Sequence, residues 1–310
     1  MKIFILYAEE NWIVDQLANE WILHNKENYT KDFRKADLIW ILSSYICDSI
    51  PINIYKNKKV ITTIHHIVPE KTDKNKIKHF KYLDTFTDLF LTFTNECKET
   101  LSNYVSNEII IKKQWVNQNL YFNIPEKNAL RDRFNIDTNT FLVGSFQRDT
   151  EGNSLKSKRF KPKLEKGPDI FIEVIKKLKI KKPNVRVLLT GYRRQYIMRE
   201  LNKINVPFYY FEMAPFSKLN ELYNCLDLYI VSSRVEGGPR AILECSIAKI
   251  PIISTDVGIA KNILSEKSIF NYNKIEEIEV CEPDLEYAYQ NAKSLTIPKH
   301  FIDFNEIFNI

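Results

Sequence analysis

The stretch from Leu228 to Gly258, LYIVSSRVEGGPRAILECSIAKIPIISTDVG, decides the fold of this chain. Its hydrophobic pattern predicts a strand, a glycine turn, a helix and a second strand, which is the order of a parallel α/β unit. Gly237 and Gly238 carry no side chains, so a ligand can approach their backbone closely. Pro239 suits the first position of the helix. We therefore expect a helix N-terminus at the carboxyl edge of a parallel sheet, where phosphorylated ligands bind.

Two carboxylates frame this turn. Glu236 directly precedes the glycines, and Glu244 lies eight positions later, in the second turn of the expected helix. A carboxylate is a poor partner for phosphate, but it accepts hydrogen bonds from pairs of hydroxyl groups. Two acids that point into one crevice suit a ligand with sugar hydroxyls on either side of a phosphate. The alternative is that Glu236 is a solvated loop acid and that Glu244 lies on the helix surface.

The length and composition of the chain indicate two domains. It has 310 residues, of which 44% are hydrophobic, and this is enough for two α/β domains of ordinary size. No apolar run approaches the roughly 20 residues that a membrane-spanning helix needs. KIFILYA, at residues 2–8, is too short for a signal sequence and is followed by two acids, so it predicts a buried strand. These features predict a cytoplasmic protein, with the inner face of the membrane as an alternative location.

Cysteine spacing and net charge argue against several classes of protein. The five cysteines are widely separated and form no C-x-x-C pair, which argues against a disulfide framework and a structural zinc site. The net charge of +6 suits anionic nucleotides or the acidic surface of a membrane. Nucleic-acid binding is the weaker explanation, because no recognised motif accompanies the charge. We therefore expect no nucleic-acid partner, and a peripheral membrane contact only as a secondary feature.

The central stretch resembles a known enzyme family. EGGPRAILE, residues 236–244, resembles the Glu-x7-Glu motif of family 4 glycosyltransferases, which have the GT-B fold. TIHHIVP, residues 63–69, resembles the family's T-x-H-D-x-x-P segment. The resemblance is strong over residues 139–265 and looser before them. It implies an α/β fold of two Rossmann-like, doubly wound domains that face a central cleft, with a trimmed N-terminal domain.

The resemblance also implies domain limits. Residues 1–137 would form an N-terminal, acceptor-side Rossmann-like domain, and residues 138–296 a C-terminal domain that binds the nucleotide sugar. RDRFNID, residues 131–137, resembles the family's bridge between the domains. The tail at 297–310 has apolar residues at helical spacing, and in this fold such a helix crosses back onto the first domain.

The resemblance assigns most of the donor site to the central stretch. Glu236 would contact the transferred sugar and Glu244 the ribose of the nucleotide, while the amides between them would contact sugar and phosphate. The segment after the predicted strand FYYF would hold the nucleobase, largely through backbone groups. The expected donor-binding residues are Gly237, Gly238, Pro239, Arg240, Glu244, Phe211, Glu212 and Met213.

In the family, an Arg and a Lys grip the donor diphosphate. By position these are Arg148, after the predicted strand FLVGS, and Lys166, at the head of an amphipathic helix. Lys163 is an alternative to Lys166. A departing nucleoside diphosphate gains negative charge, which fixed cations stabilise. His65 matches a histidine that faces the reacting sugar, so the expected catalytic residues are His65, Arg148, Lys166 and Glu236.

The acceptor side departs from the family's pattern. The first predicted strand is followed by AEEN, where the family usually has a glycine-rich loop, and His66 replaces the usual Asp. We expect His66, Glu9 and Asn11 to lie on the acceptor side. The alternative for His65 and His66 is a structural role, in which backbone hydrogen bonds satisfy both rings.

The resemblance implies a retaining glycosyltransferase that moves a sugar from a UDP- or GDP-sugar to a hydroxyl acceptor. The leaving oxygen would accept the acceptor proton, so no protein base is required. Metal is not expected, because the chain has no D-x-D triplet and two cations already stabilise the developing charge. No cofactor is expected either, since the nucleotide sugar is a substrate.

Family analogy also suggests the biological setting and its alternatives. The expected acceptor is a glycan or a lipid-linked molecule in the synthesis of a bacterial surface polysaccharide, lipopolysaccharide or glycolipid. An inverting transferase or a nucleotide-sugar epimerase could use the same scaffold. A further alternative is a non-catalytic subunit that binds a sugar nucleotide without turnover.

Overall fold

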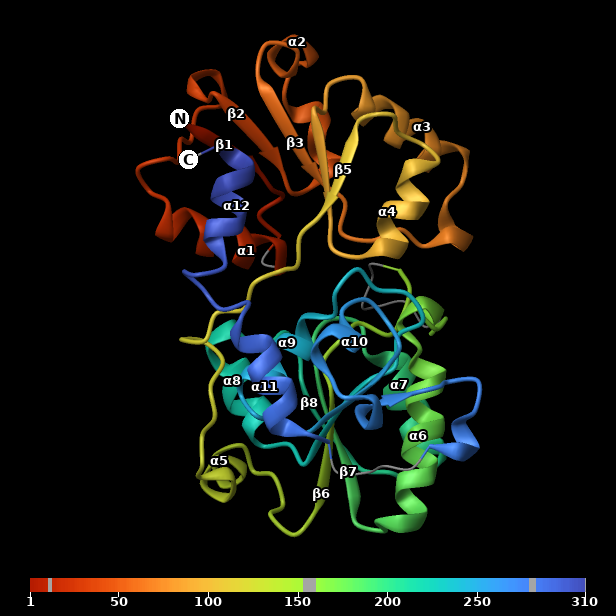
Figure 1. Ribbon diagram of the computed structural model, residues 1–310. Helices are drawn as coiled ribbons and strands as arrows, with labels where there is room; N and C mark the ends of the chain where they lie inside the picture. The colour runs from red at the N-terminus through yellow and green to blue at the C-terminus, as the bar shows by residue number, and fades with distance from the viewer. Residues whose placement is uncertain (11–12, 153–159, 279–282, 310) are drawn as a thin grey trace. The chain divides into compact units, whose positions relative to one another are not determined.

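The protein consists of two compact units. The computed structural model describes residues 1–10, 13–152, 160–278 and 283–309 (Figure 1). Unit 1 comprises Met1–Trp115 together with Ile297–Ile310, and unit 2 comprises Val116–Thr296. Each unit is built on one parallel sheet with helices packed on both faces. The predicted α/β fold of two Rossmann-like domains is confirmed.

Unit 1 contains a five-stranded sheet in the order β1-β2-β3-β4-β5. Its strands are β1 (Ile3–Leu6), β2 (Leu38–Ile41), β3 (Lys59–Thr63), β4 (Leu89–Thr92) and β5 (Glu108–Ile111). Its helices are α1 (Ile13–His24), α2 (Ile52–Tyr55), α3 (Lys74–Asp84), α4 (Asn95–Ser102) and α12 (Phe301–Phe308). The central strands are buried on both faces, which explains their nearly unbroken apolar sequences.

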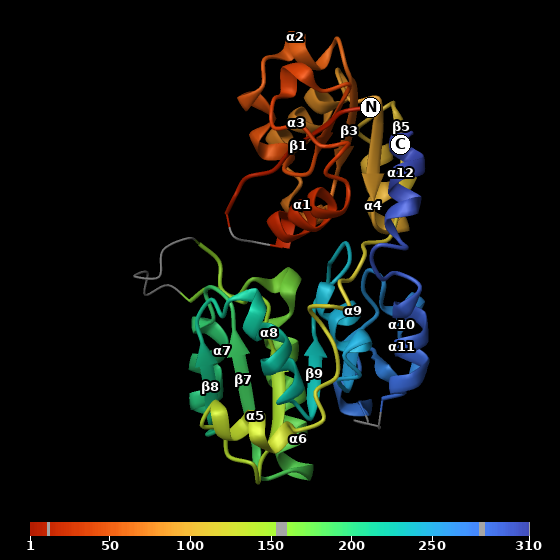
Figure 2. The same cartoon turned by 90° about the vertical axis from the view of Figure 1, so that its left-hand side faces the viewer.

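The sheet of unit 1 is doubly wound, because the chain leaves β1 on one side and returns on the other. After α1, Tyr29 forms a parallel bridge with Ile3 at one edge of β1, and β2 then pairs with the opposite edge of β1. α1 consequently packs through Trp21 on one face of the sheet, and α3 packs through Phe80 on the other (Figure 2).

The last helix completes the core of unit 1. Phe304 and Phe308 of α12 pack against Trp115 and Trp40, with ring centroids 5.0 and 4.9 Å apart. Trp21 also contacts Phe308, at 5.8 Å. Residues 297–310 therefore fold with the first unit, as the sequence led us to expect.

Unit 2 contains a six-stranded parallel sheet in the order β11-β10-β9-β6-β7-β8. Its strands are β6 (Phe141–Ser145), β7 (Val185–Thr190), β8 (Phe208–Phe211), β9 (Leu228–Val231), β10 (Ile252–Thr255) and β11 (Ile269–Phe270). Its helices are α5 (Lys127–Arg133), α6 (Pro168–Lys181), α7 (Gln195–Lys203), α8 (Phe216–Asn224), α9 (Arg240–Ile247), α10 (Ala260–Ile263) and α11 (Leu285–Lys293). The strand, helix and strand expected between Leu228 and Gly258 are β9, α9 and β10.

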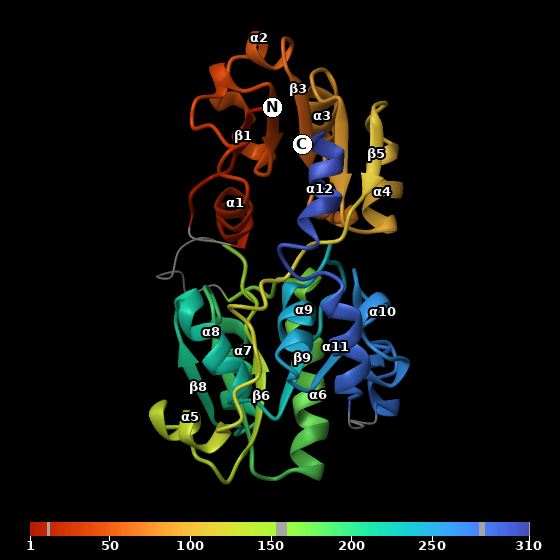
Figure 3. The same ribbon diagram turned by 60° about the vertical axis from the view of Figure 1, so that its left-hand side comes forward.

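The direction of winding reverses at β6. The chain proceeds from β6 to β7 and β8 on one side, then crosses over to β9, β10 and β11 on the other side. Helices α6 and α7 cover one face, while α8 to α11 cover the opposite face, where α11 lies beside α9 (Figure 3). This is the strand order of a Rossmann fold, with its switch point between β6 and β9.

The two units divide earlier than we expected from the sequence. The limit lies between Trp115 and Val116, whereas residue 137 was the expected end of the first domain. Residues 116–137 pack with unit 2, where α5 contacts α8. The expected assignment of residues 131–137 as a bridge between the domains is therefore corrected. They are part of the second unit.

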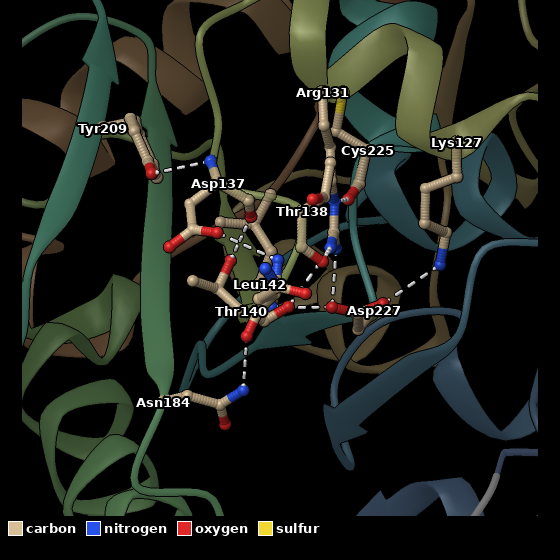
Figure 4. Close-up of polar contacts among 11 residues, drawn as sticks. Lys127, Arg131, Asp137, Thr138, Thr140, Leu142, Asn184, Tyr209, Cys225 and Asp227 are labelled. Carbon is tan, nitrogen blue, oxygen red and sulfur yellow. Dashed lines mark hydrogen bonds and ion pairs between the residues drawn. The ribbon is translucent and has the colours of Figure 1, made fainter.

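Arg131 explains why this segment belongs to unit 2. Its buried guanidinium donates to the Asp227 carboxylate at 2.6 Å and to the carbonyl oxygen of Cys225 at 2.9 Å. The same Asp227 oxygen accepts the amide N–H of Leu142, at 2.7 Å (Figure 4). These contacts join α5 to the starts of β6 and β9, because a buried charge must find partners. They lie at the amino end of the sheet, opposite the carboxyl ends of β6 and β9.

Candidate functional site

The candidate site lies where β6 and β9 end. These adjacent strands pair at Val143 and Leu228, and they belong to opposite directions of winding. In an open α/β sheet, ligands bind in the crevice outside the carboxyl ends of two such strands. The segments that leave this edge begin with Phe146 after β6 and with Ser232 after β9.

Two of the predicted residues meet at this edge. Lys166 Nζ lies 2.5 Å from Glu236 Oε1, and the two side chains are 16% and 11% exposed. Ser233 Oγ donates to the same Glu236 oxygen at 3.2 Å. The alternative that Glu236 is a solvated loop acid is therefore excluded. The Lys166 ammonium reaches the motif, whereas Lys163 Nζ lies 3.7 Å from Glu165 Oε1.

A set of short polar side chains fixes the segments that carry this ion pair. Gln147 Nε2 and Ser232 Oγ both donate to the carbonyl oxygen of Lys166, at 2.9 and 3.3 Å. Ser233 Oγ lies 3.2 Å from Gln147 Oε1, and Thr255 Oγ1 donates to the Ser233 carbonyl oxygen at 2.6 Å. The ends of β6, β9 and β10 are thereby joined to the turn that holds Lys166.

Gly167 allows this turn to approach β9. Its φ is +59°, in the left-handed region, and a Cβ atom placed on it would lie 1.7 Å from the carbonyl oxygen of Ser232. Only glycine fits such a close approach between two backbones. Pro168 then opens α6 at a position where its missing N–H is not needed. The sequence Lys-Gly-Pro therefore sets Lys166 directly against the end of β9.

The glycine turn of the motif packs against a third glycine. Gly258 has φ +57°, and an added Cβ atom would lie 3.0 Å from Pro239 Cδ and 3.2 Å from the amide nitrogen of Gly238. Pro239 was expected at the first helical position, but α9 begins at Arg240 and Pro239 is the residue that precedes it. Its φ of −60° directs the chain into α9, whose N-terminus has no side-chain cap.

Glu244 points into the interior of unit 2. The residue is 4% exposed, and its carboxylate accepts a hydrogen bond from Tyr223 Oη at 2.8 Å. Arg240 Nε lies 3.4 Å from the other carboxylate oxygen. Burial, and the nearby carboxylate of Glu244, raise the pKa of Tyr223 well above its usual value. The alternative that Glu244 is a residue of the helix surface is therefore wrong.

Arg148 contacts the segment that follows β6 and the ring of Tyr192. Its Nε donates to the carbonyl oxygen of Thr150 at 3.2 Å, its Nη2 donates to that of Gly152, and its guanidinium lies 5.6 Å from the ring centroid of Tyr192. Burial, with the neighbouring charge of Arg193, lowers the pKa of Arg148. The guanidinium thus rests on the turn that follows β7, within the same unit as Lys166.

The residues expected near the nucleobase lie at the end of β8. The carbonyl oxygen of Phe211 accepts a hydrogen bond from Thr190 Oγ1 at 2.6 Å. Glu212 is exposed, and Met213 is exposed with a positive φ of 47°. This turn follows β8, an edge strand of the sheet of unit 2.

The predicted residues of unit 1 follow β1 and β3. His65 Nε2 lies 2.9 Å from the carbonyl oxygen of Leu42, and burial lowers the pKa of its imidazole. The hydrogen bond from the histidine ring to the backbone, which we considered as the structural alternative, is therefore present for His65. His66 and Glu9 are exposed, and Glu9 has a φ of 51°. Asn11 lies outside the described residues.

The part of the chain that contains the Lys166–Glu236 pair is similar in sequence to a known family. Residues 137–279 match the family of glycosyl transferases group 1. This group 1 match contains Arg148, Lys166 and the whole Glu236 to Glu244 motif. No curated protein sequence matches the chain.

Solved structures with the same fold cover the whole chain. HepE from Anabaena, in complex with UDP, has 14% sequence identity and a TM-score of 0.77 over 100% of both chains. A complex of HepE with UDP-glucose gives a TM-score of 0.73 over 99% of this chain and 98% of the other, also at 14% identity. Sucrose-phosphate synthase from Thermosynechococcus elongatus, 13% identical, gives 0.67 over 98% of this chain and 80% of the other. These similarities confirm the GT-B fold.

The region of the group 1 match also contains buried residues that the sequence did not single out. Arg193 and Arg194 are fully buried. Arg194 Nε pairs with Asp149 Oδ2 at 2.6 Å, and its Nη1 donates to the carbonyl oxygens of Thr190, at 2.7 Å, and Ser145. Their position after the strand and glycine VLLTG was the available signal, but arginine is rarely buried, so composition gave no reason to choose them.

Two other kinds of site are absent from the described residues. No group of three His, Cys, Asp or Glu side chains among them is arranged to hold a metal ion. No helix in the described ranges is long and apolar enough to cross a membrane.

Proposed function

We propose that this chain is a retaining glycosyltransferase that transfers a sugar from a nucleotide-sugar donor to a hydroxyl acceptor. The observation that carries the proposal is the meeting of Lys166 and Glu236 at the switch point of a Rossmann unit within the group 1 match. One cation and one carboxylate at this edge provide the two chemistries that a sugar diphosphate requires. The HepE structures, which contain UDP and UDP-glucose, support a donor of this class.

In this proposal, the ion pair and the glycine turn hold the reacting end of the donor. Lys166 contacts the diphosphate, and Glu236 accepts hydrogen bonds from hydroxyls of the transferred sugar. The amides of Gly237 and Gly238 contact the phosphate and the sugar, at a helix N-terminus that favours negative charge. Arg148 supplies the second positive charge for the diphosphate.

The nucleoside of the donor binds at the C-terminal half of the Glu236–Glu244 motif. Glu244 binds the ribose hydroxyls, and Arg240 keeps its carboxylate in place. The backbone from Phe211 to Met213 contacts the nucleobase, which is uracil or guanine. Pro239 contributes by fixing the direction of the chain between these two halves.

The proposed transfer needs no protein base. The bond from the anomeric carbon to the phosphate oxygen breaks, and a bond from that carbon to the acceptor oxygen forms on the same face of the sugar. The proton of the acceptor hydroxyl moves to the departing phosphate oxygen. Lys166 and Arg148 stabilise the negative charge that develops there, so a metal ion is not needed for that task. Burial lowers the pKa of His65, so its ring is neutral at pH 7. Its Nε2–H donates to the carbonyl oxygen of Leu42, which leaves Nδ1 to accept a hydrogen bond from a hydroxyl group of the ligand.

The acceptor belongs to unit 1 in this scheme. His66, Glu9 and Asn11 follow its strands β3 and β1, and we propose that they contact a glycan or lipid-linked acceptor. Synthesis of a bacterial surface glycan or glycolipid, in the cytoplasm or at the inner face of the membrane, is the setting that we infer from family analogy.

The test is a titration of the protein with UDP, GDP and their glucose and mannose conjugates, followed by turnover with the best donor. We expect micromolar to millimolar binding of one nucleotide family and a strong loss of affinity in Lys166→Met. Lys176→Met removes a surface lysine of α6 that pairs with Glu173, and it is the matched control.

Four outcomes would overturn the proposal or a part of it. Failure of every nucleotide to bind would remove the donor site. A change in the sugar of the donor itself, without transfer to any acceptor, would indicate an epimerase. Loss of turnover after treatment with EDTA, or an inverted anomeric configuration of the product by NMR, would correct the mechanism.

A further inference from the structure

We propose that the Lys166–Glu236 ion pair makes the site select an intact nucleotide sugar over the free nucleoside diphosphate. This inference rests on the proposed function and concerns the same site. The Glu236 carboxylate pairs with the Lys166 ammonium, which is the cation that the diphosphate needs. Only a ligand that brings both a diphosphate and sugar hydroxyls gives each member of the pair a new partner.

The geometry of the pair gives this competition its strength. The Lys166 ammonium and the Glu236 carboxylate form a charge-assisted hydrogen bond, and both side chains are mostly buried. A surface pair such as Lys176 with Glu173, at 47% and 49% exposure, is weakened by solvent. A diphosphate must therefore displace a carboxylate that binds Lys166 more firmly than water does.

Displacement by a diphosphate alone leaves an unfavourable state. Lys166 would gain a phosphate oxygen, but the Glu236 carboxylate would remain close to the new negative charges, with the Ser233 hydroxyl as its remaining side-chain donor among the described residues. The hydroxyls of a sugar remove this cost, because they donate hydrogen bonds to the carboxylate. The difference between the two ligands therefore arises at Glu236.

The backbone around Lys166 and Glu236 is held in place, so both side chains can change partners without a movement of the chain. The carbonyl oxygen of Lys166 accepts hydrogen bonds from Gln147 and Ser232, and Gly167 is pressed against the end of β9. Glu236 is held by Ser233, three residues before it. Neither residue has to travel for the exchange, so the selectivity comes from charge and hydrogen bonding.

The same pair assists release of the product. Transfer of the sugar removes the hydroxyls from Glu236 and leaves a nucleoside diphosphate on Lys166. Glu236 can then bind Lys166 again and displace the product. The ion pair thus opposes accumulation of the product complex at each turnover.

The experiment compares UDP with UDP-glucose, and GDP with GDP-mannose, by calorimetric titration of four proteins. These are the wild type, Glu236→Gln, Lys166→Met and the double variant. We expect Glu236→Gln to bind the free diphosphate about five- to thirtyfold more tightly and to lose its preference for the sugar conjugate. In the Lys166→Met background, the same change should alter the affinity for the diphosphate by less than about twofold.

Controls separate this effect from general electrostatics and from misfolding. Glu173→Gln removes the same charge from the surface of α6 and should leave both affinities within about twofold of wild type. Glu236→Ala is a second variant at the site, and unfolding curves check that each protein is folded.

The outcomes distinguish this inference from the function on which it rests. If the wild type binds and turns over a nucleotide sugar but Glu236→Gln binds the free diphosphate no more tightly, the coupling is wrong and the function stands. If Glu236→Gln tightened the binding of the free diphosphate equally in the wild-type and Lys166→Met proteins, simple repulsion between Glu236 and the diphosphate would explain the effect. That result would also overturn the coupling. If the wild type binds no nucleotide, both proposals fall.

Discussion

Single residues at the switch point decide where the functional groups can lie. Gly167 has no space for a side chain, because its backbone approaches the carbonyl oxygen of Ser232. The same contact brings the preceding residue, Lys166, within reach of Glu236. The position of the cation is therefore a consequence of one glycine and the strand beside it.

Gly167→Ala tests this at the scale of one residue. The added Cβ atom would lie 1.7 Å from backbone at a φ of +59°. We expect a loss of about 3 kcal/mol or more in the free energy of unfolding, since both the contact and the backbone conformation become unfavourable. Urea unfolding measures it.

Gly152→Ala is the matched control for that prediction. Gly152 also has a positive φ, +85°, but among the described residues the nearest atom to a new Cβ there is Nη2 of Arg193, at 3.6 Å. Only the conformational cost of about 1–2 kcal/mol applies there. Equal losses in both variants would show that the contact with Ser232 is unimportant.

At the scale of elements, the turn after β7 supports the segment that carries Arg148. The pair of Arg194 with Asp149 joins this turn to the residue that follows Arg148. The carbonyl oxygen of Arg193 also accepts the amide N–H of Thr150, at 3.1 Å. Arg194 is thus a positioning residue between two strand ends.

Arg194→Met should destabilise unit 2 strongly. The substitution leaves the Asp149 carboxylate, 1% exposed, without its charged partner, and breaking such a buried pair costs about 3–5 kcal/mol. The double variant Asp149→Leu/Arg194→Met should lose less, because the buried Asp149 carboxylate, which would lack its charged partner, is removed as well. Chemical unfolding of both variants measures the difference. A double variant that is less stable than the single one would contradict this account.

Helix α12 allows a second test at this scale. Phe304 is buried against Trp40 and Trp115, whereas Ile302 on the same helix is 57% exposed. We expect Phe304→Ala to lower the stability of unit 1 by about 3–5 kcal/mol, because it leaves a cavity in the aromatic core. Ile302→Ala should change it by about 0.5 kcal/mol or less. Similar losses would indicate that α12 is only loosely attached.

At the scale of the whole molecule, the two units differ in composition, so the unfolding of unit 1 can be followed by a signal of its own. All five histidines and all four tryptophans of the chain lie in unit 1, and residues 116–296 contain neither type. Tryptophan fluorescence therefore reports on unit 1 alone. Protonation of histidine between pH 5 and 7 likewise acts on unit 1 alone.

Acidification should destabilise unit 1. Burial lowers the pKa values of His65, His79 and His300 below 6.5 in the folded protein. Charges nearby modify this at two of them: Lys76 and Asp48 at His79, and Asp303, Lys112 and Lys113 at His300. As pH falls through 6.5, the unfolded chain binds protons first, so stability present above about pH 6.5 is lost toward pH 5.

Thermal unfolding followed by tryptophan fluorescence at pH 7 and pH 5 measures this effect. His65→Gln and His300→Gln should each reduce the dependence on pH, because glutamine can donate to the same carbonyl oxygens without titrating. A midpoint that rises on acidification would contradict the sign of the prediction.

The sequence by itself determined the local features of this protein. Apolar strands, the glycine turn and the acids at 236 and 244 follow from patterns of a few residues, whereas the GT-B fold and Lys166 were predicted from the resemblance to a known family. We expected α9 to start at Pro239, one residue too early. Proline is compatible with the residue that precedes a helix as well as with its first position, so the sequence did not separate the two.

Only the tertiary structure decided which of these features meet. Lys166 pairs with Glu236 because β6 and β9 are neighbours, and their adjacency depends on the strand order of the complete sheet. Strand order likewise decided that Arg131 and Arg194 are buried and that residues 116–137 belong to unit 2. A periodicity reports which face of an element is apolar, whereas contacts between distant segments are set by how the sheet assembles.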